Sequence, residues 1–283
     1  NRCTLHRATG FDEARLKRHR IPDGMRVPAR GFLVLYENQF NPTPGVAPSF
    51  ELDAAGGAVY LAAADASGAL TGYITGAEFP ATGDGISAGR LATSVGIDFT
   101  ALRARTFGAD APASVAEFRT GTGAQNALPL VGPAVINEVF YHPPPGGDEF
   151  LELHNHSGAP LALHDAVSGR GWRGSGLKNL EGSGDFGVSP GATIPAGGYL
   201  LVVGIDPALF RGRHGVPAAA PIHGPFGGAL DNSGERLKLR RPETVEGGEV
   251  AFVVVDHVRY NDHAPWPAGA DGEGRSLERL IAA

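Results

Sequence analysis

Short stretches of alternating apolar and polar residues recur along this chain. Between residues 149 and 155, Leu151 and Leu153 alternate with Glu152 and His154. A period of two places successive side chains on opposite faces and is typical of a half-buried strand. The pattern therefore predicts a strand whose Leu151 and Leu153 side chains face a core.

Strand-like patterns outnumber helical ones. We predict strands at 135–141, 149–154, 198–203, 235–239 and 250–260. About seven or more short strands joined by turns indicate a β-sandwich. Helices are predicted only at 12–18 and 207–214, the second with Asp206 as N-cap and Pro207 at the first helical position.

Composition agrees with an all-β chain of two domains. The 283 residues include 42 Gly and 22 Pro, which favours strands and turns over long helices. The net charge of −6 argues against a nucleic-acid partner. No apolar run is long enough to predict a membrane span. Cys3 is the only cysteine, so no internal disulfide can form.

Three motifs recur in the same order, with an insertion lengthening the second copy at each step. They pair 27–34 with 194–201, 52–61 with 230–239, and 83–91 with 272–280. Agreement in order, spacing and residue type predicts a tandem duplication.

The two copies differ in extent. The second begins near Ala134 with two strand-like runs, and nothing before Arg26 matches these runs. We therefore predict an N-terminally truncated first copy at 1–108, a linker at 109–133 and a nearly whole second copy at 134–283. The chain starts with Asn1 and has no signal-peptide core, so we expect it to be a segment of a longer protein.

The second copy resembles the bacterial lamin tail domain. The motifs that carry the resemblance are Ala134-Val-Ile-Asn-Glu-Val139, Tyr141-His-Pro-Pro144, Asp148-Glu-Phe-Leu-Glu-Leu153, Ile194-Pro-Ala-Gly-Gly-Tyr-Leu-Leu-Val202 and Leu230-Asp-Asn-Ser-Gly-Glu-Arg-Leu237. Residues 20–108 resemble the back part of a preceding copy. The stretch 167–187 departs from the pattern, with Gly171-Trp172 as the remnant of an expected strand.

The resemblance implies an immunoglobulin-like β-sandwich. It also implies an accessory module of a large secreted or surface protein, of the kind that accompanies hydrolases or CotH-like kinase domains. Fold analogy alone does not assign a function. From it we expect an extracellular or cell-surface location, and partners among the neighbouring domains, a surface polymer or another protein.

Candidate metal ligands cluster around the first two strands of the second copy. They are His142, His154 and His156. His154 and His156 share a strand face, but zinc needs three or four convergent ligands, so we favour a structural role for them. Calcium binding at Asp84 and Asp98, or at Asp262 and Asp271, lacks the alternating spacing of a calcium loop.

The sequence offers candidates for two other kinds of site, a glycosidase carboxylate pair and an exposed aromatic side chain that binds a ligand. Glu149 and Glu152 are three residues apart on a strand and face opposite sides, which argues against a glycosidase pair. Trp266 is expected to pack, whereas Trp172, in a Gly-rich stretch, is the better candidate for an exposed aromatic that binds a ligand. We predict no catalytic or cofactor-binding residue.

These observations favour a non-catalytic interaction or tethering module. Two alternatives stay open: a carbohydrate- or surface-polymer-binding module that uses Trp172, and a metal-dependent hydrolase fragment that uses the region from His142 to His156.

Overall fold

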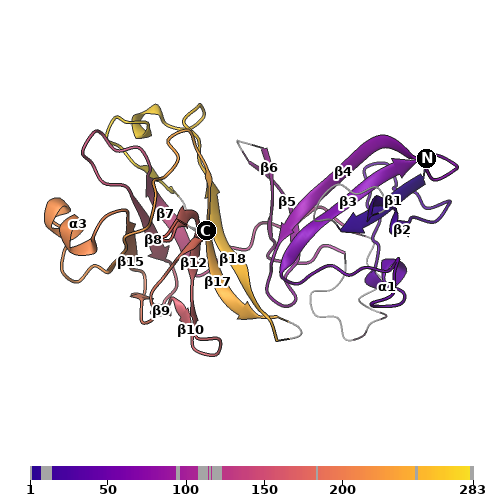
Figure 1. Cartoon of the computed structure of the whole chain (residues 1–283), viewed down its shortest axis with the longest axis horizontal. Coiled ribbons are helices and arrows are strands. Elements are labelled where there is room, and N and C mark those ends of the chain that lie inside the picture. The colour runs from indigo at the N-terminus through magenta and orange to yellow at the C-terminus, as the bar shows by residue number, and fades with distance from the viewer. Residues whose placement is uncertain are drawn as a thin grey trace. The chain divides into compact units, whose positions relative to one another are not determined.

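The chain folds into two compact units that are predominantly β. In this computed structural model the described residues are 2–7, 15–93, 96–107, 114, 116, 123–182, 184–245 and 248–280. Unit 1 comprises Asn1–Ala92 and Ile97–Leu130, and unit 2 comprises Thr93–Gly96 and Val131–Ala283 (Figure 1). Within the described residues, no helix is long and apolar enough to cross a membrane.

Unit 1 contains a four-stranded antiparallel sheet in the order β2-β1-β3-β4. Its strands are β1 (Arg2–Arg7), β2 (His19–Arg20), β3 (Gly56–Ala64) and β4 (Leu70–Pro80). Asp65 closes the β3–β4 hairpin, because its Oδ1 accepts hydrogen bonds from the backbone nitrogens of Ser67 and Ala69.

Smaller elements complete unit 1. They are the 3-10 turn η1 (Arg15–Lys17), the helix α1 (Glu37–Phe40) and the paired strands β5 (Ala88–Thr93) and β6 (Gly96–Ala101). The helix predicted at 12–18 is represented by η1, and residues 12–14 lie outside the described residues. Phe40 and Phe50, both 5% exposed, stack with ring centroids 4.9 Å apart and anchor α1 to the unit.

The division between the two units falls between Leu130 and Val131, inside the segment predicted as a linker. Residues 123–130, within the predicted linker at 109–133, belong to unit 1. Leu130 donates its backbone N–H to Ala101, and Leu102 forms a bridge with Pro129. Backbone pairing of this kind is not visible in a Gly- and Pro-rich local pattern. Much of 109–122 lies outside the described residues.

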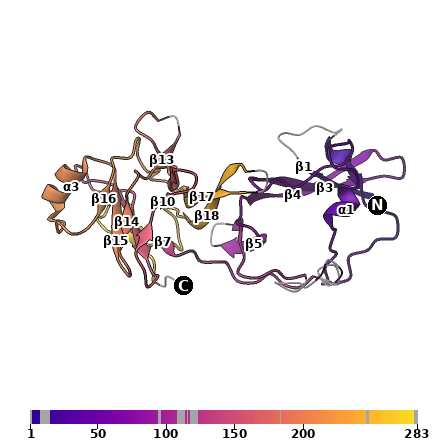
Figure 2. The ribbon, with the colours of Figure 1, turned by 90° about the horizontal axis from the view of Figure 1, so that it is seen from below.

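Unit 2 has two larger sheets. The first runs β16-β15-β8-β7-β19 and the second β13-β12-β17-β18. Figure 2 labels β7, β15 and β16 of the first sheet and β13, β17 and β18 of the second. The first comprises β7 (Ala134–Phe140), β8 (Phe150–Asn155), β15 (Tyr199–Val203), β16 (Ile222–His223) and β19 (Leu277–Glu278). The second comprises β12 (Arg173–Lys178), β13 (Asp185–Gly187), β17 (Arg236–Thr244) and β18 (Val250–Arg259).

One core joins these sheets. Leu151 and Leu153 of β8 are buried in the same apolar cluster as Leu237 and Leu239 of β17. The predicted alternation in β8 is confirmed, because Leu151 and Leu153 are each 3% exposed while Glu152 and His154 are only partly buried. Short pairs join β9 (Leu161–Ala162) to β14 (Thr193–Ile194) and β10 (His164–Asp165) to β11 (Arg170–Gly171).

The predicted second helix is confirmed as α3 (Pro207–His214), and a 3-10 turn η2 (Ala268–Ala270) precedes β19. Asp206 caps α3, accepting hydrogen bonds from the nitrogens of Ala208 and Leu209 at 2.9 Å each. Asp148 then ties the far end of α3 to the sheet, because its carboxylate binds both Arg213 and His214 at 2.9 Å.

Candidate functional site

The outer face of the five-stranded sheet is its side opposite the core, where Phe150, Glu152 and His154 of β8 point. Helix α3 covers one end of this face, because Phe210 contacts the Phe150 ring with centroids 5.9 Å apart. The other end, around His154 and Tyr199, is the open part.

His154 and Tyr199 form an aromatic platform on the open part. They are directly opposed in the β8–β15 pairing. Their rings stack with centroids 4.6 Å apart and an interplanar angle of 19°. Tyr199 remains 47% exposed, so one face of a rigid aromatic pair is presented to solvent.

A row of three glutamates lies beside this platform. Glu152 on β8 opposes Glu138 on β7, which in turn opposes Glu278 on β19. Directly opposed like charges destabilise a sheet, so such a row has a cost for folding. Asn137 offsets part of it by donating to Glu152 Oε1 at 2.9 Å, and Ser276 donates to Glu138.

The electrostatics of Glu152 follow from this placement. Burial raises the pKa of its carboxyl above the ordinary value, and the hydrogen bond from Asn137 opposes that shift. The nearby carboxylates of Glu138 and Glu278 raise the pKa further. The outer face therefore combines an exposed aromatic pair with a negative row that attracts cationic groups.

The three histidines singled out from the sequence do not converge. His156 lies near His154, with ring centroids 6.5 Å apart, but its Nε2 is engaged by the carbonyl of Gly132. His142 follows β7, and the pairing of Phe140 with Phe150 places it at the opposite end of β8 from His154. No group of three or more metal-ligating side chains that could hold an ion occurs among the described residues.

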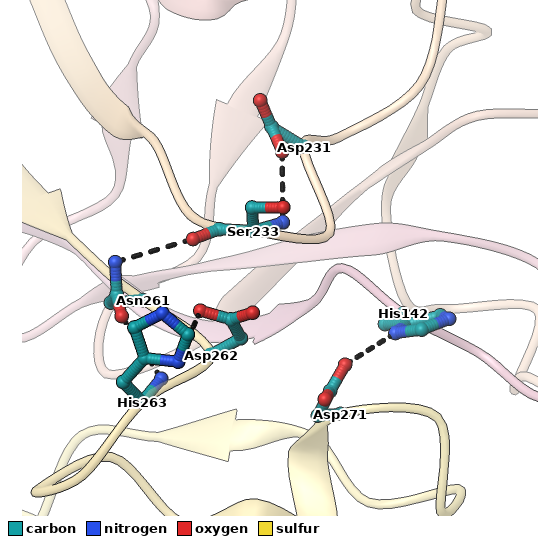
Figure 3. A network of polar contacts seen from close by, with 7 residues as sticks. All are labelled: His142, Asp231, Ser233, Asn261, Asp262, His263 and Asp271. Carbon is teal, nitrogen blue, oxygen red and sulfur yellow. Dashed lines mark hydrogen bonds and ion pairs between the residues drawn. The ribbon is translucent and has the colours of Figure 1, made fainter.

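His142 lies among the loops at one end of unit 2 (Figure 3). Its Nδ1 lies 2.6 Å from Asp271 Oδ1, and its carbonyl accepts a hydrogen bond from Gly272. Asp262 pairs instead with His263 at 3.1 Å. Asp262 and Asp271, two of the four aspartates considered for calcium, are thus each engaged by an imidazole.

The remaining contacts at this end join two turns. Asp231 Oδ1 accepts from the Ser233 nitrogen at 2.8 Å, and Asn261 Nδ2 donates to the Ser233 carbonyl at 3.2 Å (Figure 3). Glu149 accepts from the backbone nitrogen of Leu230 at 2.9 Å, well away from the Glu152 face. These hydrogen bonds therefore hold the loops of unit 2 together, and the residues that form them do not make up a catalytic site.

The remaining carboxylates considered from the sequence are Asp84 and Asp98 in unit 1 and the pair Glu149 and Glu152 in unit 2. In unit 1, Asp98 is buried at 4% exposure, whereas Asp84 is exposed. Glu149 and Glu152 lie apart, as their spacing on the strand predicts, with Glu149 engaged at a turn and Glu152 on the outer face.

Trp172 is not an exposed ligand-binding aromatic, and this expectation is corrected. It is 5% exposed and belongs to the core of unit 2. Its backbone donates to Leu163 and accepts from Val188, each at 2.9 Å, so the Gly-rich stretch is pinned into the sheets. Trp266 packs against the same core, as predicted.

Tyr199 was missed by the sequence reasoning. The run from Gly198 to Val203 reads as uniformly apolar, which hides the difference between its two faces. The available signal was the period of two, because Tyr199, Leu201 and Val203 share the side opposite Leu200 and Val202.

No protein-family model, curated protein or solved structure matches this chain.

Proposed function

We propose that this chain is a non-catalytic interaction module that tethers a larger secreted or cell-surface bacterial protein to a protein partner through the outer face of unit 2. The observation that carries the proposal is the exposed Tyr199 ring, held flat on His154 beside Glu152. Rigid aromatic side chains contribute large contact area at low entropic cost, and they dominate the energetics of many interfaces.

The sheet edges favour binding by the face rather than by strand addition. The edge strands β16 (Ile222–His223) and β19 (Leu277–Glu278) are two residues long each. Short edges offer few backbone groups to a docking strand. The negative row of glutamates fits a partner patch rich in Lys and Arg.

A tandem of lamin-tail-like, immunoglobulin-type domains is part of this proposal. The β3–β4 and β17–β18 hairpins are each part of a four-stranded sheet. An equivalent turn precedes each hairpin: Asp53 Oδ1 accepts from Ala55 at 2.9 Å, as Asp231 does from Ser233 at 2.8 Å. These matches support common descent of the two units.

A second pair of turns supports the same duplication. Gly31 donates its N–H to Pro28 at 3.0 Å, and Gly198 donates to Pro195 at 2.9 Å. Arg30, with φ of 57°, is the only non-glycine with positive φ among the described residues, and it aligns with Gly197, whose φ is 61°. The first copy thus retains a left-handed turn that the second builds with glycine.

The test uses the full chain and cell-envelope fractions of the producing bacterium. We expect binding to the protein-containing fraction, loss of that binding after protease treatment of the fraction, and at least a tenfold weakening by Tyr199→Ala. Tyr73→Ala is the matched control, because Tyr73 is 65% exposed but lies in unit 1. Absence of binding, or equal binding by wild type and Tyr199→Ala, overturns the proposal.

A carbohydrate-binding role is the second candidate. The exposed Tyr199 ring can stack on a sugar. The carboxylate of Glu152 on the neighbouring strand, which accepts a hydrogen bond from Asn137, can hydrogen-bond the sugar hydroxyls. Binding to deproteinised polysaccharide that Tyr199→Ala abolishes would favour this role over protein tethering. The metal-dependent hydrolase alternative would need His142 beside the other two histidines, and β8 separates them.

A further inference from the structure

Unit 1 contains a polar cavity that the proposed function does not use. Its volume is about 170 Å³. One wall is the start of β2, with Arg18 and His19, and the facing wall is the loop after α1. That loop is secured across its base, because Thr43 donates its backbone N–H to Ser49 Oγ at 3.3 Å.

His19 lines this cavity. Its Nε2 is buried and has no hydrogen-bond partner, while its ring meets the Phe40 ring edge-on with centroids 6.4 Å apart. Burial also lowers the pKa of His19 below its ordinary value, which favours the neutral ring.

The charge of the cavity is positive. Arg18 is exposed and makes no hydrogen bond or ion pair with any part of the chain that the structure describes. No carboxylate is among the described residues that line the cavity. Glu37 of the adjacent helix is engaged by Asn41 Nδ2 at 2.8 Å, and Asp23 pairs with Arg20 at 2.7 Å.

Part of the lining is apolar, and the remainder includes the polar residues Gln39, Thr43 and Ser49. Phe40, Val46 and Pro48 contribute hydrocarbon surface. An apolar cavity of about 150 Å³ accommodates a benzene-sized molecule. The cavity in unit 1 therefore has room for a ring of that size together with a polar group at its basic wall.

We propose that this cavity binds a small organic carboxylate with a compact apolar body. Its carboxylate accepts hydrogen bonds from the Arg18 guanidinium. Its apolar body packs against Phe40, Val46 and Pro48. A guanidinium–carboxylate contact is a charge-assisted hydrogen bond, stronger than a neutral one, so the anion is preferred over a neutral molecule of the same shape.

The test uses benzoate as the probe and the full chain. Binding is measured by calorimetry and by changes in the ¹H–¹⁵N spectrum of labelled protein. We expect benzoate to shift resonances of His19 and of the loop from Thr43 to Ser49. Benzyl alcohol, which has the same ring without the charge, should bind at least tenfold more weakly.

Two variants separate this site from general attraction of anions to a basic surface. Arg18→Gln should weaken benzoate binding about tenfold. Arg20→Gln is the matched control, since Arg20 is a neighbouring exposed arginine that pairs with Asp23, and it should leave binding unchanged. The proposal would be overturned by any of three results. These are no benzoate binding at about 20 mM, an affinity for benzyl alcohol equal to that for benzoate, or an equal loss of benzoate affinity in the two variants.

Discussion

The imidazole of His154 stacks on the ring of Tyr199, with centroids 4.6 Å apart and planes 19° from parallel. The two residues are 45 positions apart in sequence, and adjacent strands bring them into direct register. Stacking restricts both side chains, so the exposed Tyr199 ring is ordered before any partner arrives. A preordered ring loses less conformational entropy on binding.

The stack should be measurable as a coupling energy. A double-mutant cycle of His154→Ala and Tyr199→Ala is expected to give a coupling of about 0.5–1 kcal/mol in the free energy of unfolding by urea. A cycle of Tyr73→Ala with His154→Ala should give no coupling, because Tyr73 lies on β4 of unit 1. Strict additivity of the first pair would show that the rings do not support each other in solution.

The glutamate row should make stability depend on pH. The folded-state pKa of Glu152 is raised, so ionising it at neutral pH costs stability, and the neutral form is favoured as pH falls. Glu152→Gln is therefore expected to raise the free energy of unfolding at pH 7 by up to about 1 kcal/mol. The gain should shrink as pH falls toward the ordinary glutamate value of 4.5, because the raised pKa makes the folded wild type take up its proton above that value.

Glu243→Gln is the control for that measurement. Glu243 pairs with Arg241 at 2.6 Å on β17, so its substitution removes an attraction rather than a repulsion. It should produce no stabilisation at pH 7. A Glu152→Gln variant that is no more stable than wild type at pH 7 would contradict a net repulsion within the row.

A largely buried ion pair links β18 to the end of the chain. Asp256, 12% exposed at its side chain, contacts Arg279 at 2.7 Å and accepts from the Ile136 nitrogen at 2.8 Å. Arg279→Met leaves a buried carboxylate without its cation and should cost about 3 kcal/mol in thermal or urea unfolding. Met keeps the aliphatic bulk, so the loss reports the charge together with the hydrogen bond that Arg279 Nε donates to the Ile136 carbonyl at 3.1 Å.

The pH dependence of this variant has a definite sign. Burial raises the pKa of Asp256, and Arg279 opposes that shift, so removal of Arg279 raises the pKa further. A raised folded-state pKa gives stability that is present at low pH and lost as pH rises. The deficit of Arg279→Met should thus be smaller at pH 5 than at pH 8, and Asp256→Asn on that background should recover part of it. A deficit that neither change affects would point to lost packing instead.

Local pattern predicted much of unit 2 and little of its outer surface. The strands at β7, β8, β15, β17 and β18 and the capped helix α3 follow from periodicity and from Asp206-Pro207. The stack of His154 on Tyr199 depends on strand register, which no local pattern contains. Trp172 was misjudged for the same reason, because its burial depends on hydrogen bonds to Leu163 and Val188 rather than on its glycine neighbours.

The cavity of unit 1 was equally invisible in the sequence. Arg18 and His19 are separated from the loop at 42–49 by α1 and more than twenty residues. Nothing in their composition indicates that they face each other. Conversely, the turn motifs of the two copies were visible because Pro, Gly and Asp act on the backbone locally.

Arg30 allows a direct test of the turn that the two units share. A left-handed conformation strains a residue that has a Cβ, whereas glycine adopts it freely. Arg30 has φ of 57° and is exposed, so Arg30→Gly removes strain without removing a buried contact. We expect the unit 1 transition in urea to gain about 0.5–1 kcal/mol, although glycine also increases the entropy of the unfolded chain.

Arg26→Gly provides the matched comparison. Arg26 is also exposed and lies four residues earlier, but its φ is not positive, so glycine there brings only the entropic cost. It should lower the stability of unit 1 by up to about 1 kcal/mol. Opposite signs for the two variants would establish that the turn at Arg30 is left-handed, as at Gly197. If both variants are destabilised alike, the first unit does not form this turn, and an important support for the duplication is lost.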